Sequence, residues 1–404
     1  MAIATDEHLI DEVINRSVAE IYPSKDAFQD ALRGGKRLTF YVGIDPTADY
    51  VHLGHSTNYL LLERLHSMGH RIIVLVGDFT AMIGDPSDKS AMRVQLTRDQ
   101  VKENLVTFKE QIGKILDFTD TSNPIEFKFN SDWLANLSFQ DSVELASNFT
   151  VQQMVERDAF KKRIDQRKPL FVHEFFYPLM QGYDSVAMEV DAEIGGTDQT
   201  FNMLAGRVLL KRYKNKEKFV IATTLLENPE TGEKMMSKSL GTGIALNEDP
   251  KNMFFKTMQL PDAGIIQCFI DCTRKDMQEI NELRDRLKDG TNPRDVKLQL
   301  AYEIVKMYHG SVAAETAQND WIAQVSKKEV STDLPTLRII GGDLLEAIVN
   351  EHLFDSKSKV RRLMNEGAVK INGVRVDLDT YTNHLAGGAI LSIGKKHTFV
   401  IEVA

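Results

Sequence analysis

The stretch "LTFYVGIDPTADYVHLGHSTNYLLLERLHSMGHRIIVLVG", residues 38–77, decides the fold of the N-terminal half. Its beginning, "LTFYVGID", alternates in polarity and breaks at Gly43 and Pro46, which indicates a strand that runs into a loop. "STNYLLLERLHSMG" has the periodicity of a helix and ends at Gly69. "RIIVLV" is a continuous apolar run of the kind found in buried parallel strands. Strand, helix and strand form a βαβ unit, so we expect an α/β domain with a mostly parallel sheet.

Other patterns extend outward from this unit. Residues 1–35 have helical apolar spacing in "HLIDEVINRSVAEIY" and a stop signal in "RGGKR". "FVIATTLLE", at 219–227, predicts a later strand of the sheet. From about residue 245, amphipathic helices follow one another without strands between them, and 328–340 is a polar, Pro-containing break. Beyond the break, two short helices precede "VKINGVRV", in which Asn372-Gly373 predicts a hairpin.

We therefore expect three parts. An α/β domain covers 1–244, and an all-α domain covers 245–330. After a linker at 331–340, a small α+β module covers 341–404. A chain of 404 residues is long enough for this division.

Composition narrows the function classes. The chain has 42% hydrophobic and 26% charged residues, as soluble globular proteins do, and lacks an apolar run long enough to span a membrane. The N-terminus has no signal-peptide core. Two cysteines, Cys268 and Cys272, are expected to be reduced core residues, so we expect a cytoplasmic protein. A net charge of −9 argues against a protein that coats nucleic acid, but it permits a local basic patch.

His52 and His55, in "HLGHSTN", lie three residues apart at an expected helix start. They share a helix face next to backbone N–H groups, which attract anions. A metal site is disfavoured, because a metalloprotease pair needs i, i+4 spacing with a glutamate between. Taken alone, the pair is more often two polar residues without a special task. Gly54 costs helix stability, so it predicts close approach of a flat group such as an adenine.

A second polar element lies in "ENPETGEKMMSKSLGTGI", residues 227–244. Lys238, between Ser237 and Ser239, could bind a polyphosphate through a point charge and two hydroxyl donors. If this segment is considered alone, a solvated basic loop is the more common interpretation.

Together, "HLGH" and "MMSKS" resemble the HIGH and KMSKS signatures of class I aminoacyl-tRNA synthetases, whose catalytic domain is Rossmann-like. Carboxylate attack on the α-phosphate of ATP needs no protein nucleophile, only in-line positioning and donors where charge develops. The resemblance therefore implies a phosphate site whose catalytic residues are Thr47, His52, His55 and Lys238.

The helix in "FYPLMQGYDS" is similar to the YxxxQxxD helix of the tyrosyl and tryptophanyl members. In the tyrosyl family, the aspartate and a tyrosine on the strand before HIGH both bind the substrate phenol, and that strand here offers Tyr41. A site selective for a phenol must bury polar groups that suffer when the hydroxyl is absent, for which tyrosyl-tRNA synthetase is itself the standard example. The resemblance implies a tyrosine site formed by Tyr41, Asp85, Tyr177, Gln181 and Asp184.

Three more segments resemble the tyrosyl family. "IGDPSDKSAMR" is similar to its GDPSGK segment, which implies that Asp85 binds the α-amino group and that Lys89 and Arg93 lie near pyrophosphate or the tRNA acceptor end. "IGGTDQTFN" matches its GGSDQ segment, which implies Asp198 on the ATP ribose and Gln199 near the reacting carboxylate. "FNSDW" supplies Asn130. The implied ATP-binding residues are Gly43, Asp45, Gly54, Gly196, Asp198, Gln199, Ser237, Lys238 and Ser239.

The C-terminal stretch "SKSKVRRLMNEGAVKINGVRV" resembles the ribosomal-protein-type RNA-binding domain of bacterial tyrosyl-tRNA synthetases. Basic residues gather here in an otherwise acidic chain, and such side chains supply affinity for phosphates rather than base identity. We expect contact with folded tRNA by shape. The implied tRNA-binding residues are Lys357, Lys359, Arg361 and Arg362, with Lys370 and Arg375 nearby.

The resemblance implies a tyrosine–tRNA ligase that uses ATP with Mg²⁺, binds L-tyrosine and tRNA(Tyr) and forms a homodimer, without a protein-bound metal or a membrane contact. In one departure from the pattern, Met235 occupies the slot of the first KMSKS lysine and Lys234 precedes it. Residues 152–170 have no assigned role. The alternatives are a tryptophan–tRNA ligase, a small nucleotidyltransferase, which the chain length disfavours, and a catalytically idle RNA-binding paralogue.

Overall fold

The computed structural model describes residues 3–86, 96–236, 242–326, 336–339, 343–350, 354, 356–372, 374–378, 380–394 and 397–403. The chain divides into two compact units, Met1–Asn319 and Asp320–Ala404. Within the described ranges, no helix is long and apolar enough to cross a membrane.

The first unit is built on a sheet whose described strands run in the order β1-β6-β5-β2-β3-β4. Strands β2 to β6 pair in parallel, as the "LTFYVGID" and "RIIVLV" patterns predict. Along the chain, the strands progress from β2 to β4 in one direction and from β5 to β6 in the other. The order therefore reverses between β2 and β5, and ligands of open α/β sheets bind at such a reversal, beyond the carboxyl ends of the strands. The strands are β1 (Val18–Tyr22), β2 (Thr39–Ile44), β3 (Arg71–Val76), β4 (Glu126–Phe129), β5 (Ala192–Gly196) and β6 (Phe219–Thr223).

The expectation of helix throughout 1–35 is wrong in its middle. Helices α1 (Glu7–Asn15) and α2 (Lys25–Arg33) flank strand β1, which pairs antiparallel with β6 at the edge of the sheet. The short segment "VAEIY" contains β-branched and aromatic residues that favour a strand once a partner is present. That partner is about 200 residues away, as in the pair Val18 and Thr223.

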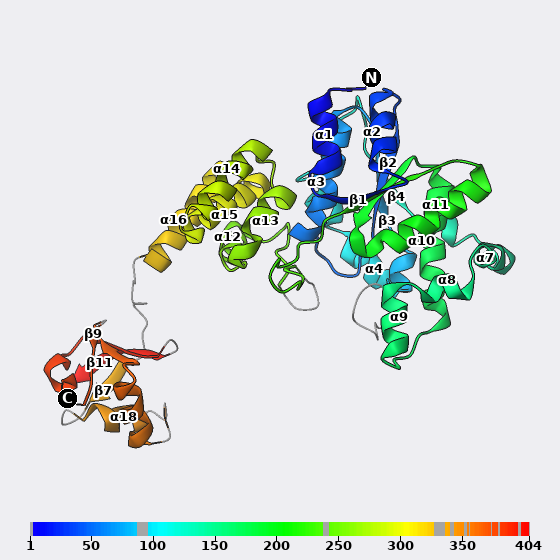
Figure 1. The fold of residues 1–404 in the computed structure, drawn as a ribbon. Coiled ribbons are helices and arrows are strands. Elements are labelled where there is room, and N and C mark those ends of the chain that lie inside the picture. The colour runs from blue at the N-terminus through cyan, green and yellow to red at the C-terminus, as the bar shows by residue number, and fades with distance from the viewer. Residues whose placement is uncertain are drawn as a thin grey trace. The chain divides into compact units, whose positions relative to one another are not determined.

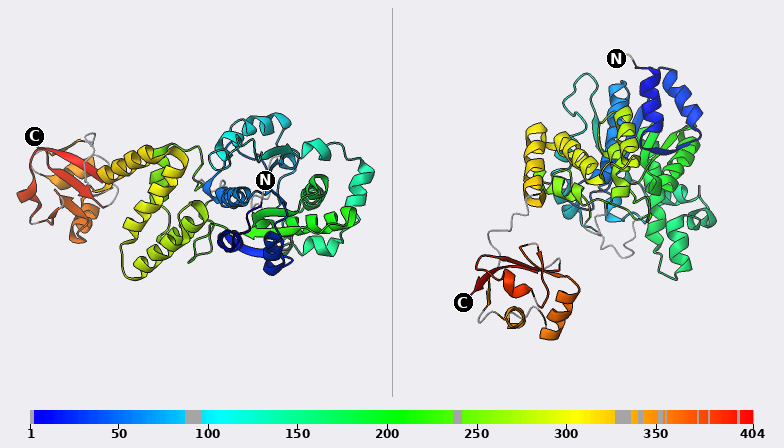
Figure 2. Two further views of the ribbon diagram at one scale, coloured as in Figure 1. Left: turned by 90° about the horizontal axis from the view of Figure 1, so that it is seen from above. Right: turned by 60° about the vertical axis from the view of Figure 1, so that its left-hand side comes forward.

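Helices cover both faces of this sheet (Figures 1 and 2). Helix α3 (Leu53–Ser67) lies on one side, with Leu61, Leu62 and Leu65 fully buried. The pair α10 (Tyr177–Met188) and α11 (Thr200–Lys214) lies on the other. Gly182 and Gly206 let these two helices approach closely, since a Cβ on Gly182 would lie 3.1 Å from the Gly206 nitrogen.

Shorter helices follow β3, β4 and β5. They are η1 (Thr80–Met82), α4 (Arg98–Leu105), α5 (Phe108–Ile112), α6 (Ser131–Leu134), α7 (Phe139–Ala146), α8 (Val151–Val155), α9 (Asp158–Asp165), η2 (Val172–Phe176) and η3 (Thr197–Gln199).

The first unit ends in helices without described strands between them, as the pattern after residue 245 predicts. They are α12 (Pro250–Met258), η4 (Asp262–Gly264), α13 (Ile265–Cys272), α14 (Met277–Lys288), α15 (Pro293–His309) and α16 (Ser311–Ser326), the last of which crosses into the second unit. Helix α13 packs on α3, where the Cys272 thiol lies 3.7 Å from the Leu53 carbonyl. The guanidinium of Arg16 donates to the Thr273 carbonyl at 2.7 Å. Cys268 and Cys272 are free and buried.

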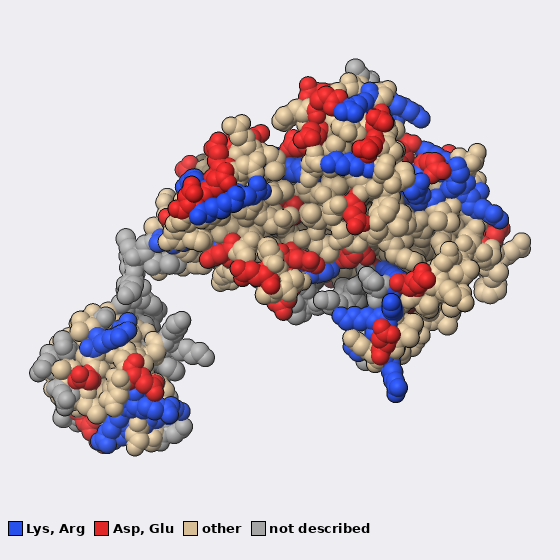
Figure 3. Space-filling view, viewed as in Figure 1, with Lys and Arg blue, Asp and Glu red and all other residues tan. Residues whose placement is uncertain are grey.

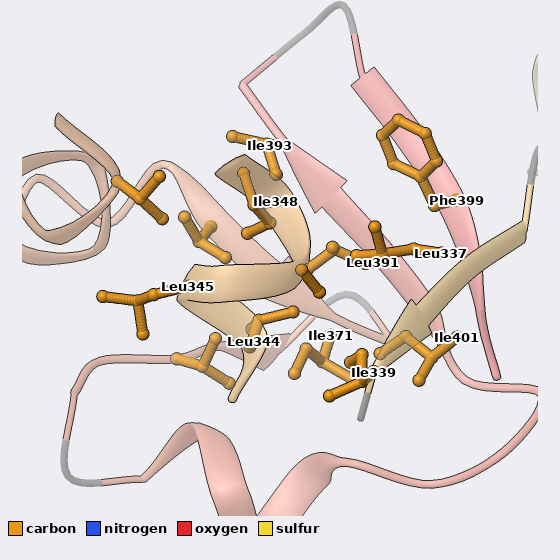
Figure 4. Packing of buried hydrophobic residues seen from close by; sticks show 14 of the residues in the cluster. Leu337, Ile339, Leu344, Leu345, Ile348, Ile371, Leu391, Ile393, Phe399 and Ile401 are labelled. Atoms are coloured by element: carbon orange, nitrogen blue, oxygen red, sulfur yellow. The ribbon is translucent and has the colours of Figure 1, made fainter. Parts of the chain in front are cut away.

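The second unit packs two helices on a sheet with the described order β7-β11-β10-β8-β9. Its core consists of aliphatic side chains from both layers, among them Leu337, Ile348 and Leu391 (Figure 4). The predicted hairpin is present, and Asn372 between its strands has a φ of 51°, a conformation that asparagine tolerates well. Its elements are β7 (Thr336–Ile339), α17 (Leu344–Asn350), α18 (Lys357–Asn365), β8 (Val369–Ile371), β9 (Val374–Arg375), η5 (Tyr381–His384), β10 (Ile390–Ile393) and β11 (His397–Val403).

The linker expected at 331–340 needs one correction. Thr336–Ile339 form β7, which pairs in parallel with β11 and buries Leu337 and Ile339. Alternating apolar residues in "TLRI" fit a strand with one buried face. In the sequence, Pro335 directly before this segment had favoured a linker.

Candidate active site

A cavity of about 710 Å³ opens beyond the carboxyl ends of β2, β3, β5 and β6, at the reversal of strand order. Gly43 on β2 has open space above its Cα, so a ligand can reach the strand backbone. The lining also includes side chains from α3, α10 and the segment 223–236. One cavity therefore collects residues from distant parts of the first unit.

Tyr41 and Asp184 line the cavity, and both are buried. The indole nitrogen of Trp133 donates to Oδ1 of Asp184 at 2.7 Å, and the Asn130 amide lies 3.4 Å from Oδ2. Burial raises the pKa of Asp184 well above its ordinary value, against the two hydrogen bonds. Burial and the carboxylates of Glu193 and Asp184 raise the pKa of Tyr41. A protonated phenol beside a buried carboxyl group suits a ligand that carries a hydroxyl.

Helix α10 brings Tyr177, Gln181 and Asp184 onto one face, as their spacing predicts. The Tyr177 hydroxyl donates to Oδ2 of Asp45 at 2.9 Å. The Gln181 amide nitrogen donates to Oε1 of Glu193 at 3.0 Å. The helix thus lines the cavity with a row of polar groups, each fixed by a partner.

Asp45 is held at the end of β2 by a second hydrogen bond. The Thr80 hydroxyl donates to its Oδ1 at 2.7 Å. Gly77 makes this arrangement possible, because a Cβ there would lie 1.9 Å from that oxygen and 2.3 Å from the Thr80 hydroxyl. Any other residue at position 77 would displace Asp45.

Asp85 lies between two donors. The Arg157 guanidinium donates to one carboxylate oxygen at 3.1 Å, and the Gln199 amide donates to the other at 2.6 Å. Arg157 is buried, and its guanidinium lies 5.3 Å from the ring centre of Phe160. Asp85 therefore offers the cavity a carboxylate with a fixed orientation.

His52 and His55 begin helix α3. His52 is the N-cap residue, and its Nδ1 accepts the Gly54 N–H at 3.1 Å. Nδ1 of His55 accepts the His52 N–H at 3.2 Å, and the two rings stack with 3.8 Å between their centres. Because both Nδ1 atoms accept, the neutral rings carry their protons on Nε2. The pair can thus offer two N–H donors to a ligand.

The histidine segment is also joined to the segment that follows residue 241. The Leu53 N–H donates to the Ile244 carbonyl at 3.0 Å, and the Leu246 N–H donates to the Val51 carbonyl at 2.8 Å. Gly54 is explained locally, since a Cβ there would lie 3.0 Å from the His52 ring. The two motifs noted in the sequence are therefore structural neighbours.

Lys234 and Met235 differ sharply in environment. The Lys234 ammonium lies 2.8 Å from Oδ2 of Asp198 and lines the cavity. Met235 is buried, and its sulfur occupies the space that a Cβ on Gly264 would need. The hydrogen bond from the Met235 N–H to the Leu226 carbonyl, at 2.8 Å, fixes this register.

A family model of known proteins matches this chain over residues 33–326, and it describes the class I tRNA synthetases of the tryptophan and tyrosine group. The chain belongs to this family. The tyrosine–tRNA ligase 2 of Clostridium acetobutylicum is 42% identical over 390 residues, covering 95% of this chain and 96% of that relative. The tyrosine–tRNA ligase of Haemophilus influenzae is 39% identical over 393 residues, covering 97% and 96%.

Solved structures agree on the fold. The tyrosyl-tRNA synthetase of Archaeoglobus fulgidus, complexed with L-tyrosine, has a TM-score of 0.60 at 21% identity and covers 77% of this chain and 99% of its own. A C-terminally truncated mitochondrial tyrosyl-tRNA synthetase from Aspergillus nidulans has a TM-score of 0.66 at 20% identity, with 78% and 94% covered. The mixed α/β fold with a parallel sheet is therefore that of class I synthetases.

Most of the predicted site residues of this synthetase line the one cavity. Their individual roles remain predictions. The cavity-lining members are Tyr41, Gly43, Asp45, Thr47, His52, Gly54, His55, Asp85, Tyr177, Gln181, Asp184, Gly196, Asp198 and Gln199. Lys89, Arg93, Ser237, Lys238 and Ser239 lie outside the described residues.

The predicted tRNA-binding residues lie on α18 of the second unit. Figure 3 shows Lys and Arg side chains of this unit gathered where Figure 1 places α18. Arg361 and Arg362 are exposed, whereas the Lys357 ammonium is 3.0 Å from Asp343 and 2.9 Å from Glu346. Lys357 thus contacts two carboxylates, whereas Arg362 contacts one, that of Glu366, at 3.4 Å.

Sequence reasoning missed Glu193, which lines the cavity, and Trp133 and Arg157, which bond the cavity-lining residues Asp184 and Asp85. Trp133 follows β4, and only the adjacent Asn130 was noted. Glu193 is a charged residue inside the otherwise small and apolar strand "AEIGG", which is a detectable signal. Arg157 lies in the segment that had no assigned role, and no pattern in the sequence linked it to Asp85.

Proposed function

We propose that this chain activates L-tyrosine with ATP and transfers the tyrosyl group to the 3′ end of tRNA(Tyr). The observation that carries the proposal is that the buried residues Tyr41 and Asp184 line the same cavity as the His52–His55 pair. The pair suits a phenol, and the histidines suit a phosphate. Full-length similarity to tyrosine–tRNA ligases supports the same conclusion.

In this proposal, tyrosine enters with its phenol toward Tyr41 and Asp184. A phenylalanine side chain would not supply the hydroxyl that these buried polar groups bond in tyrosine, which penalises the wrong substrate. Asp85, Tyr177 and Gln181 hold the ammonium group. Asp85 is suited to this task because Arg157 and Gln199 fix both of its oxygens.

ATP occupies the open side of the cavity, with its ribose on Asp198. Gly43, Asp45, Gly54, Gly196 and Gln199 complete the proposed nucleotide site. We propose that the nucleotide carries Mg²⁺, whose oxygen ligands come from the phosphates. Ser237, Lys238 and Ser239 close on the phosphates from the segment before residue 242.

The reaction needs positioning more than covalent chemistry. A tyrosine carboxylate oxygen attacks the α-phosphorus, and the bond from that phosphorus to the bridging oxygen breaks to release pyrophosphate. Thr47, His52, His55 and Lys238 donate to the oxygens that gain charge. His52 and His55 donate through Nε2, because their Nδ1 atoms accept backbone N–H groups.

In the second step, a hydroxyl of the terminal adenosine of tRNA attacks the tyrosyl carbonyl and AMP leaves. We propose that Lys89 and Arg93 contact pyrophosphate or the acceptor end. The helices of 245–330 face the anticodon side, and the 341–404 module binds tRNA through Lys357, Lys359, Arg361 and Arg362. The exposure of Arg361 and Arg362 supports this assignment.

We propose that the working form is a cytoplasmic homodimer. Large apolar side chains are exposed on α7 and α8: Phe139 is 85% exposed and Val151 is 71% exposed. We propose that these exposed apolar side chains contribute to the dimer interface. The free, buried state of both cysteines fits a reducing compartment.

Charging of tRNA tests the proposal. Labelled tyrosine, tryptophan or phenylalanine is incubated with the chain, ATP, Mg²⁺ and total bacterial tRNA, and acid-precipitable label is counted. Label from tyrosine alone supports the proposal. Label from tryptophan would support the tryptophan–tRNA ligase alternative, and absence of label would support the idle RNA-binding paralogue.

A further inference from the structure

A buried ion pair lies behind the tyrosine end of the cavity. Lys218, immediately before β6, contacts Oε2 of Glu193 on β5, and both side chains are almost completely buried. Buried ion pairs stabilise a protein weakly at best, because both ions lose hydration. Because this ion pair contributes little to stability and lies beside the ligand cavity, we expect the pair to have a role in that cavity.

Glu193 determines how Gln181 presents its amide. A carboxylate only accepts hydrogen bonds, so Gln181 must turn its nitrogen toward Oε1 of Glu193, at 3.0 Å. The amide oxygen, on the opposite side of the group, is then available to accept from a donor in the cavity. An ammonium group needs such an acceptor.

Ser185 extends the cluster to Tyr41. The Lys218 ammonium donates to the Ser185 hydroxyl at 2.9 Å, and that hydroxyl lies 3.0 Å from the hydroxyl of Tyr41. The same ammonium lies 5.9 Å from the centre of the Tyr41 ring. A Cβ on Gly206 would lie 2.6 Å from the ammonium, so the chain has a glycine where Lys218 must fit.

Lys218 also limits repulsion between two buried carboxyl groups. Glu193 is among the groups that raise the pKa of Asp184. Burial lowers the pKa of Lys218, and Glu193 opposes that change. A cation beside Glu193 therefore lets the cavity hold Glu193 and Asp184 together.

We propose that Glu193 and Lys218 are positioning residues for tyrosine: Glu193 sets the orientation of the Gln181 amide, and Lys218, through Ser185, sets the Tyr41 hydroxyl. This inference rests on the proposed tyrosine site. The inference predicts that Glu193 and Lys218 affect the affinity for tyrosine and leave the affinity for ATP unchanged.

The test is tyrosine-dependent pyrophosphate exchange by the full chain, with active sites counted by a burst of adenylate formation. The variants are Glu193→Gln, Lys218→Met and the double variant, which removes both charges together and so guards against a folding failure. Lys297→Met is the control, because Lys297 is a buried lysine that bonds the Leu260 carbonyl and does not line the described cavity.

We expect Glu193→Gln and the double variant to raise the KM for tyrosine about tenfold, as loss of one oriented hydrogen bond implies. The KM for ATP stays the same in both, and Lys297→Met leaves the KM for tyrosine unchanged. A wild-type KM for tyrosine in the double variant would overturn the inference and leave the pair with a structural role only. No exchange by the wild-type chain would instead overturn the proposed function itself.

Discussion

The indole nitrogen of Trp133 lies 2.7 Å from Oδ1 of Asp184, so a residue outside the cavity lining holds this cavity-lining carboxyl group in place. Asn130 approaches the other oxygen at 3.4 Å. A buried carboxyl group with this support keeps one geometry, and a hydroxyl that meets it must match that geometry. Selectivity for a phenol then follows from the cost of burying Asp184 against a ligand that lacks a hydroxyl.

The Asp184→Asn variant should reduce kcat/KM for tyrosine by about 10- to 100-fold, as expected when a buried polar group loses its hydrogen bond to the ligand. The amide keeps an oxygen for Trp133 but turns a nitrogen toward the amide of Asn130. Pyrophosphate exchange with tyrosine and with phenylalanine measures the change, and circular dichroism checks the fold. An unchanged kcat/KM for tyrosine would remove Asp184 from the pocket.

The Lys234→Met variant should slow tyrosine activation about tenfold or more, because a cation within the cavity is lost near Asp198. Met235→Leu, a swap of similar volume at a buried site, should leave the rate unchanged. Single-turnover formation of tyrosyl-adenylate measures both. Equal rates for Lys234→Met and the wild-type chain would show that Lys234 does not replace the missing first lysine of the loop motif.

Replacing Lys359 and Arg361 by alanine should raise the KM for tRNA in charging and leave pyrophosphate exchange unchanged. Each lost phosphate contact should also reduce the salt slope of tRNA binding by about one. Lys36→Ala, at an exposed site in the first unit, is the control. If the double variant binds tRNA with the wild-type salt slope, α18 does not contact the phosphates.

His70 should make the protein less stable in mild acid. It is fully buried, its Nδ1 accepts the Leu38 N–H at 3.3 Å, and burial lowers its pKa from 6.5 to about 4. The unfolded chain binds a proton at His70 more tightly than the folded chain does, so protonation favours unfolding. The stabilisation that depends on neutral His70 is therefore complete above pH 6.5 and is lost as the pH falls toward 4. The loss reaches about 3 kcal/mol at most.

Urea unfolding between pH 7.5 and pH 4.5 measures this loss. The control is His70→Asn, whose side-chain oxygen can accept the same N–H but does not titrate in this range. Its free energy of unfolding should fall less steeply with decreasing pH than that of the wild-type chain. Parallel pH profiles for the two proteins would exclude His70 as the cause.

Local patterns predicted the centre of the fold well. The segment 38–77 contains two buried strands and their helix in sequence, so periodicity alone was sufficient. Strand β1 was missed because its strand character depends on pairing with β6, about 200 residues away. Strand β7 was missed for a similar reason, since its partner β11 lies at the end of the chain.

The residues of the candidate site also include some that local sequence patterns predict and some that only the fold reveals. Residues that belong to motifs, such as His52 and Asp184, were found from the sequence, because motif residues lie at short, recognisable intervals along the chain. Glu193 and Lys218 were not, since each is a lone charge until the fold joins two neighbouring strands. The different environments of Lys234 and Met235 also needed the structure, where the hydrogen bond from the Met235 N–H to the Leu226 carbonyl fixes the register.

Amino-acid-dependent exchange of labelled pyrophosphate into ATP, without tRNA, tests the central claim most directly. The account predicts exchange with L-tyrosine and essentially none with L-phenylalanine or L-tryptophan at equal concentration. Exchange with tryptophan would contradict the roles given to Tyr41 and Asp184. Absence of exchange with every amino acid would contradict the adenylation chemistry itself.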